Sequence, residues 1–189
     1  MGITKERDER DGYIYDAAIK GADTTVWQDV VGAIALDTTG LNSTVRVSAA
    51  RLHTYLLHIY GDYEFSLSSP SNPGIATDMS WGLRNPKDLT RGAAYFEMDT
   101  NSLFRAISYD DFGNQQATTV TWDTNWSDTQ VRYKIRWEQD IVNFLINDTV
   151  VATHSTRVGT FPQSLEIRNG AATNLDMAYV RVARAGAIV

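Results

Sequence analysis

The chain has 189 residues, no cysteine and a formal net charge of −6, with an isoelectric point near 5.0. The lack of cysteine excludes disulfides and thiolate metal sites. The acidic balance argues against nucleic acid as a partner, because affinity for phosphates depends on clustered lysine and arginine. The length fits one domain with a substantial core.

The N-terminal stretch from Met1 to Gly12 has mixed charge and contains no apolar run. We therefore expect a protein made without a secretory signal. No apolar run in the chain reaches the roughly eighteen residues of a transmembrane helix, so we expect no membrane span. The expected location is the cytoplasm or a virion, and the exterior of the cell if the chain is part of a particle.

Residues 1–42 are predicted to be an N-terminal arm and edge segment, followed by a sandwich domain at residues 43–189. This segment carries Tyr13, Tyr15 and Trp27 among Gly, Asp and Thr, which makes it too apolar for a free linker. Two interpretations stay open. The segment forms extra strands on the edge of the sandwich, or it is an assembly arm that docks on a neighbouring subunit.

Strand signals recur from Ser43 onward, about one in every ten residues, with turn residues between them. The segment 131–137 places Val131, Tyr133, Ile135 and Trp137 on one face and three cations on the other, which is the period of a half-buried strand. Asn147-Asp148 between two apolar runs predicts a two-residue hairpin. The expected core includes Tyr133, Ile135, Trp137, Phe144, Ile146, Val180 and Val182.

The order of these motifs resembles the concanavalin A-like lectin/glucanase superfamily. The resemblance covers roughly residues 43–184 and rests on Y-x-I-x-W at 133–137, the polar hairpin, the closing Y-V-R-V at 179–182 and Y-G-D-Y-E at 60–64. It implies an all-β chain folded as an antiparallel β-sandwich, a jelly roll, with an N-terminal arm. Laminarin-type glucanases, laminin G-like domains and many non-catalytic modules share this superfamily.

One strand has catalytic potential by this resemblance. In laminarinase-like glycosidases the equivalent strand reads E-x-D-x-E, so Glu97 would be the nucleophile and Asp99 its helper. Spacing of two places Glu97, Asp99 and Asn101 on one face of a strand. Because an amide cannot act as a general acid, Asn101 breaks the signature where a retaining glycosidase needs its second carboxyl group. We therefore expect no enzyme and no hydrolysis of β-glucans. Glu97 and Asp99 would then be ordinary solvated residues or a sugar-binding remnant.

No cofactor is expected, although calcium stays possible. Members of the superfamily often bind structural calcium through an aspartate in the closing strand, but Ala178 stands at that position here. Asp176 is the nearest acid on the same face, and Asp110 and Asp111 in a predicted hairpin tip offer further oxygen ligands.

Trp122 and Trp126 are the best candidates for a binding surface, with Tyr95 as a further one. Such rings stack on sugars and anchor protein interfaces. The alternative is that the two tryptophans plug one end of the sandwich.

Three functions remain open. The favoured one is a non-catalytic structural or assembly module, such as a virion surface or decoration protein, with a homo-oligomer or viral particle as partner. The alternatives are a glycan-binding lectin-like module and a laminarinase-like glycosidase with an altered acid.

Overall fold

A computed structural model gives the fold. It describes the backbone of residues 13–16, 27–37, 44–58, 60–68, 78–85, 88, 90–101, 103–126, 129–160, 163–170 and 175–183. Side chains are described only from residue 60 onward, up to residue 182. The predicted assembly residues Tyr13, Tyr15 and Trp27 therefore have a described backbone only, and residues 1–12 lie outside the described part.

The described secondary structure is almost entirely β. The strands are β1 (Tyr13–Asp16), β2 (Trp27–Asp37), β3 (Thr44–His58), β4 (Gly61–Ser68), β5 (Met79–Arg84), β6 (Ala94–Met98), β7 (Phe104–Tyr109), β8 (Gln115–Thr119), β9 (Val131–Trp137), β10 (Val142–Ile146), β11 (Thr149–His154), β12 (Gln163–Asn169) and β13 (Leu175–Ala183). A single 3-10 turn, η1 (Thr124–Trp126), follows β8. None of the described residues forms a helix long and apolar enough for a membrane span.

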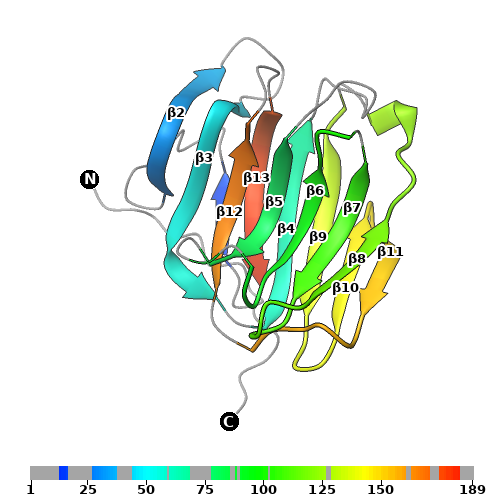
Figure 1. Cartoon of the computed structure of the whole chain (residues 1–189). Coiled ribbons are helices and arrows are strands. Elements are labelled where there is room, and N and C mark those ends of the chain that lie inside the picture. Colours follow the sequence, from blue (N-terminus) through cyan, green and yellow to red (C-terminus); the bar gives the residue numbers. More distant parts are fainter. Residues whose placement is uncertain are drawn as a thin grey trace.

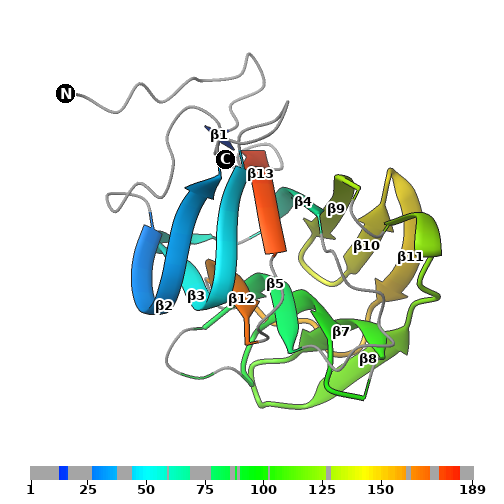
Figure 2. The ribbon, with the colours of Figure 1, turned by 90° about the horizontal axis from the view of Figure 1, so that it is seen from above.

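The strands form two antiparallel layers packed face to face (Figures 1 and 2). The front sheet contains β12, β5, β6, β7 and β8, and the back sheet contains β13, β4, β9, β10 and β11. Strand β3 joins the layers, since its residues 45–47 pair with β13 and its residues 50–58 pair with β12. The predicted all-β antiparallel sandwich is confirmed.

The N-terminal segment contributes two of these strands. β1 pairs with β13, with Tyr13 opposite Val182, and β2 runs along β3 from Trp27 to Asp37. The described parts of the segment, residues 13–16 and 27–37, thus pair with other strands of the same chain.

The core lies between the sheets and is rich in aromatic rings. Trp81 of β5 has its centroid 4.8 Å from that of Tyr133 in β9, and Phe96 of β6 meets Phe144 of β10 edge to face at 5.3 Å. All seven predicted core residues are buried, each at most 6% exposed. Because side chains alternate along a strand, these contacts also identify the outward-facing residues of each sheet.

The hairpin between β10 and β11 is the predicted two-residue turn. Asn147 and Asp148 have φ of 48° and 67°. Positive φ at both positions is the geometry of a type I′ turn, whose twist matches that of the flanking strands. The turn also fixes the register in which Phe144 and Ile146 point into the core.

Candidate active site

The outer face of the front sheet carries a cluster of carboxylates and guanidinium groups. Glu97 and Arg105 stand opposite each other on β6 and β7, and Arg105 Nη2 lies 2.6 Å from Glu97 Oε2 and 3.0 Å from Asp99 Oδ2. The side chains of Glu97 and Asp99 are 19% and 15% exposed. One guanidinium nitrogen therefore bridges both predicted acids in a partly buried setting.

Asp99 does not continue the strand but forms the turn after it. Its Oδ1 accepts hydrogen bonds from the backbone N–H groups of Asn101 at 2.8 Å and Leu103 at 3.0 Å. An aspartate side chain that accepts backbone N–H groups in this way replaces the hydrogen bonds between strands. Strand β6 therefore ends at Met98. The prediction that Asn101 shares a strand face with Glu97 and Asp99 is wrong, because Asn101 lies exposed in the turn.

The exposure of the outward residues varies over the front sheet. Glu166 and Arg84, on β12 and β5, are 1% and 7% exposed, whereas Arg168 on β12 and Asp78 before β5 are half-buried. The outward residues of β8, Gln115, Ala117 and Thr119, are exposed. Glu97, Asp99 and Arg105 lie between these extremes.

Tyr95 lies beneath this surface rather than on it. The residue is 2% exposed, with the Arg84 guanidinium 4.2 Å above its ring and Tyr109 stacked at 6.4 Å. Burial raises the pKa of Tyr95, so its hydroxyl stays neutral. The ring offers no open face for a sugar, and its role here is to support Arg84 and Tyr109.

Trp122 and Trp126 lie together, as predicted, but pack on the core. Their rings meet edge to face at 5.4 Å, and both contact Phe104, whose ring points inward from β7. Both are half-buried. This arrangement fits the plug interpretation.

The described part of the chain contains no set of side chains that could hold the calcium ion considered from the sequence. No three His, Asp or Glu side chains come together there. Asp176 is half-buried on β13, opposite Ser68 of β4. Asp110 is used otherwise, since its carboxylate accepts hydrogen bonds from Phe112, Asn114 and Arg157.

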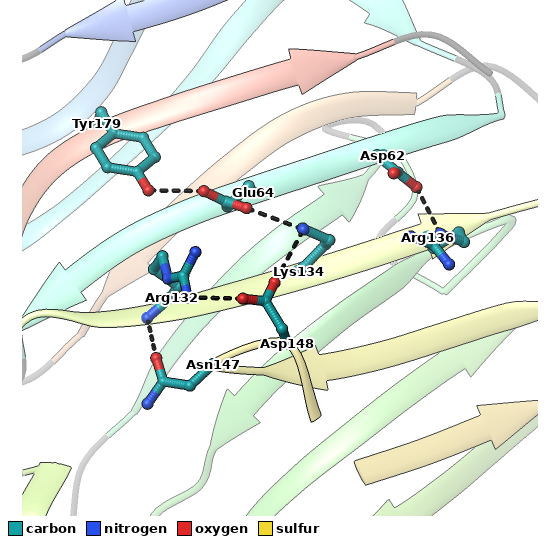
Figure 3. Close-up of polar contacts among 8 residues, drawn as sticks. All are labelled: Asp62, Glu64, Arg132, Lys134, Arg136, Asn147, Asp148 and Tyr179. Carbon is teal, nitrogen blue, oxygen red and sulfur yellow. Dashed lines mark hydrogen bonds and ion pairs between the residues drawn. The ribbon is translucent and has the colours of Figure 1, made fainter. Parts of the chain in front are cut away.

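The outer face of the back sheet carries a second polar network (Figure 3). The Tyr179 hydroxyl donates to Glu64 at 2.6 Å, and Lys134 joins Glu64 at 3.1 Å to Asp148 at 3.2 Å. Arg136 pairs separately with Asp62 at 3.0 Å. These pairs lie across the sandwich from Glu97 and provide matched control positions.

The chain was compared with known proteins by sequence and by structure. No protein-family model and no curated sequence matches it. Among solved structures, a Bacillus licheniformis beta-glucanase superposes with a TM-score of 0.73 at 11% identity, over 92% of this chain and 98% of that one. The laminarinase catalytic domain from Thermotoga maritima gives 0.73 at 12% identity, over 93% and 98%. A Crh5 transglycosylase in complex with NAG gives 0.70 at 17% identity, over 93% and 84%.

The fold is the concanavalin A-like jelly roll. The expectation of a non-enzyme is contradicted, because these jelly-roll neighbours are glucanases and a transglycosylase. That expectation rested on Asn101 as a replaced acid, and Asn101 is not on the strand at all.

The sequence missed Arg105, Arg84 and Glu166. The alternation of side chains along β7 marks Arg105 as outward-facing. The local sequence does not reveal the register of β7 on β6 that places Arg105 opposite Glu97. Glu166 reaches Arg84 at 3.5 Å through the pairing of β12 with β5, strands that are far apart in the chain.

Proposed function

We propose that the protein is a carbohydrate-active enzyme that attacks the anomeric carbon of a β-glucan-type sugar with Glu97. The observation that carries this proposal is that Glu97 lies partly exposed on the outer face of the front sheet. Its Oε2 is held by Arg105, whereas its Oε1 has no hydrogen-bond partner among the described residues. The jelly-roll neighbours named as glucanases and a transglycosylase support this choice of chemistry.

Glu97 and Asp99 are held together by one guanidinium group. Glu97 and Asp99 each contact the same Nη2 of Arg105, at 2.6 and 3.0 Å, so the two contacting oxygens are separated by at most the sum of these distances. We infer a retaining reaction, in which Glu97 forms a covalent glycosyl ester and Asp99 orients Arg105.

The proposal is tested with 2,4-dinitrophenyl glycosides of β-1,3- and β-1,4-linked glucose oligomers. We expect the wild-type protein to release dinitrophenolate, Glu97→Gln to lose at least 100-fold in rate, and Glu64→Gln to keep the wild-type rate. Glu64 is a like-for-like control, since it is also a cation-paired strand glutamate but faces outward from the back sheet.

No release by the wild type from any of these donors, or equal release by Glu97→Gln, contradicts the proposal. Saturable binding of the oligomers without release would replace it with the glycan-binding alternative.

The assembly role stays a prediction. It depends on residues 1–12 and on the side chains of Tyr13, Tyr15 and Trp27, which are outside the described parts, and no described contact supports a virion or oligomer. The location in a virion or the cytoplasm stays a prediction as well.

A further inference from the structure

We propose that Arg168 and Asp78 bind an uncharged, hydroxyl-rich sugar unit of the substrate, about two rings away from the ring that Glu97 attacks. The inference rests on the proposed function and deepens it, because it names a substrate of at least three linked sugars. Arg168 belongs to β12 and Asp78 directly precedes β5, the strand between β12 and β6.

The strand registers place Arg168 and Glu97 in one row across the front sheet. Arg168 is opposite Ser80 of β5, and Ser80 is opposite Glu97 of β6. Directly opposed residues of an antiparallel sheet point to the same face. It is the outer face here, because the neighbouring residues Ile167 and Phe96 are buried in the core. Neighbouring strands lie about 4.8 Å apart, so two strand steps separate the backbones by roughly 10 Å, the length of about two β-linked sugar units.

The side chain between Arg168 and Glu97 in this row is small and nearly buried. Ser80 is 3% exposed, whereas the side chains of Arg168 and Asp78 are 36% and 39% exposed. A sugar chain that runs along the row from Glu97 toward β12 therefore passes over Ser80 and meets the Arg168–Asp78 pair.

The backbone holds this pair in place. Asp78 O accepts a hydrogen bond from the Gly170 N–H at 2.6 Å, and the Asp78 carboxylate is bonded to the Arg168 guanidinium. A Cβ atom at Gly170 would meet Asp78 Oδ2 at 2.7 Å, so glycine at this position makes room for the carboxylate. Groups that are fixed before binding lose little conformational freedom when a ligand arrives. The pair is thus preorganised for a ligand.

An arginine–aspartate pair matches the hydroxyl groups of a sugar. A guanidinium group is a donor only, and a carboxylate is an acceptor only. A hydroxyl group does both, so two neighbouring sugar hydroxyls can accept from Arg168 and donate to Asp78. Such charge-assisted hydrogen bonds are stronger than neutral ones. Because the two charges of the pair cancel, it favours an uncharged sugar over an acidic one.

The test measures binding of β-1,3- and β-1,4-linked glucose hexasaccharides by isothermal titration calorimetry, in a Glu97→Gln background. For the hexasaccharide that binds more tightly, we expect Arg168→Ala to weaken binding at least about tenfold, because charge-assisted hydrogen bonds to the sugar are lost. Asp78→Ala should act in the same direction. Arg136→Ala is the matched control, since the ion pair of Arg136 with Asp62 on the back sheet is similarly exposed, at 45% and 36%. It should leave the affinity unchanged.

A second readout separates this role from a merely structural one. In the protein with Glu97 intact, Arg168→Ala should keep its rate on a 2,4-dinitrophenyl β-glucan disaccharide within threefold. A disaccharide on Glu97 is too short to reach the pair. The midpoint of urea unfolding should also stay close to the wild-type value.

Hexasaccharide binding that is undetectable, unchanged in Arg168→Ala, or weakened as much in Arg136→Ala would overturn the inference while leaving the proposed function intact. Loss of disaccharide turnover together with stability in Arg168→Ala would show a structural role and overturn it as well. Binding that depends on Arg168, in a protein whose wild type turns over no donor, would support this sugar site and contradict the proposed function.

Discussion

Gly82 of β5 lies directly against the backbone of Tyr95 in β6, so closely that a Cβ atom at Gly82 would meet Tyr95 Cα at 2.5 Å and Tyr95 Cβ at 2.6 Å. Its φ of +153° also lies outside the region that L side chains ordinarily adopt. The close approach lets Arg84, two residues along β5, cover the Tyr95 ring from the same face.

Gly82→Ala should therefore be strongly destabilising. We expect a loss of about 3 kcal/mol or more in the free energy of unfolding, from backbone strain combined with overpacking. Gly113→Ala is the control, since Gly113 also has positive φ but the nearest atom to its Cβ would be Thr90 O at 3.4 Å. It should lose only about 1–2 kcal/mol. Equal losses in urea unfolding would contradict the close-approach argument.

Trp137 anchors the back sheet. The side chain is fully buried and meets Tyr60 edge to face at 6.3 Å. We expect Trp137→Ala to cost about 3–5 kcal/mol. Phe112→Ala removes a ring that is 87% exposed, so its unfolding midpoint in urea should stay close to the wild-type value. A Trp137→Ala protein as stable as Phe112→Ala would argue against the sandwich core.

His154 should make stability depend on pH. It is fully buried, with its ring nitrogens bonded to Ser108 and Thr118, and burial lowers its pKa to about 4 from 6.5. The unfolded chain therefore binds the proton more readily. The contribution of neutral His154 to the free energy of unfolding is fully present above about pH 6.5. It is lost as the pH falls toward 4, which lowers the free energy of unfolding by about 2–3 kcal/mol. The free-energy difference between wild type and His154→Gln should shrink across this range, and parallel pH curves would refute the assignment.

The Tyr179 hydroxyl should stabilise the back sheet through Glu64. Burial and the hydrogen bond to Glu64 raise the pKa of Tyr179, so the phenol remains a donor across the working range of pH. Tyr179→Phe should cost about 1 kcal/mol. In a Glu64→Gln background the cost should be smaller, because the charge-assisted bond is already gone. An unchanged cost in that background would show that the two residues are not coupled.

The sequence predicted the parts of the fold that depend on local alternation and turn chemistry. The period of two over residues 131–137 identified Tyr133, Ile135 and Trp137 as core, and Asn147-Asp148 predicted the hairpin. The site was harder to predict because it depends on pairing between strands. Spacing alone predicts a strand that continues through Asp99, because it does not reveal that the Asp99 side chain accepts hydrogen bonds from the backbone N–H groups of Asn101 and Leu103. Arg105 becomes part of the site only through the register of β7 on β6.

The role of Glu97 as the nucleophile is tested most directly by the intact mass of the protein after incubation with a 2-deoxy-2-fluoro dinitrophenyl glycoside of a β-glucan disaccharide. Because the fluorine slows breakdown of the glycosyl ester, we expect one disaccharide label to accumulate on the peptide that contains Glu97. Glu64→Gln should be labelled like the wild type and Glu97→Gln should stay unlabelled. A wild-type protein that gains no mass while still binding the disaccharide, or a label on another residue, would contradict the assignment of Glu97 as the nucleophile.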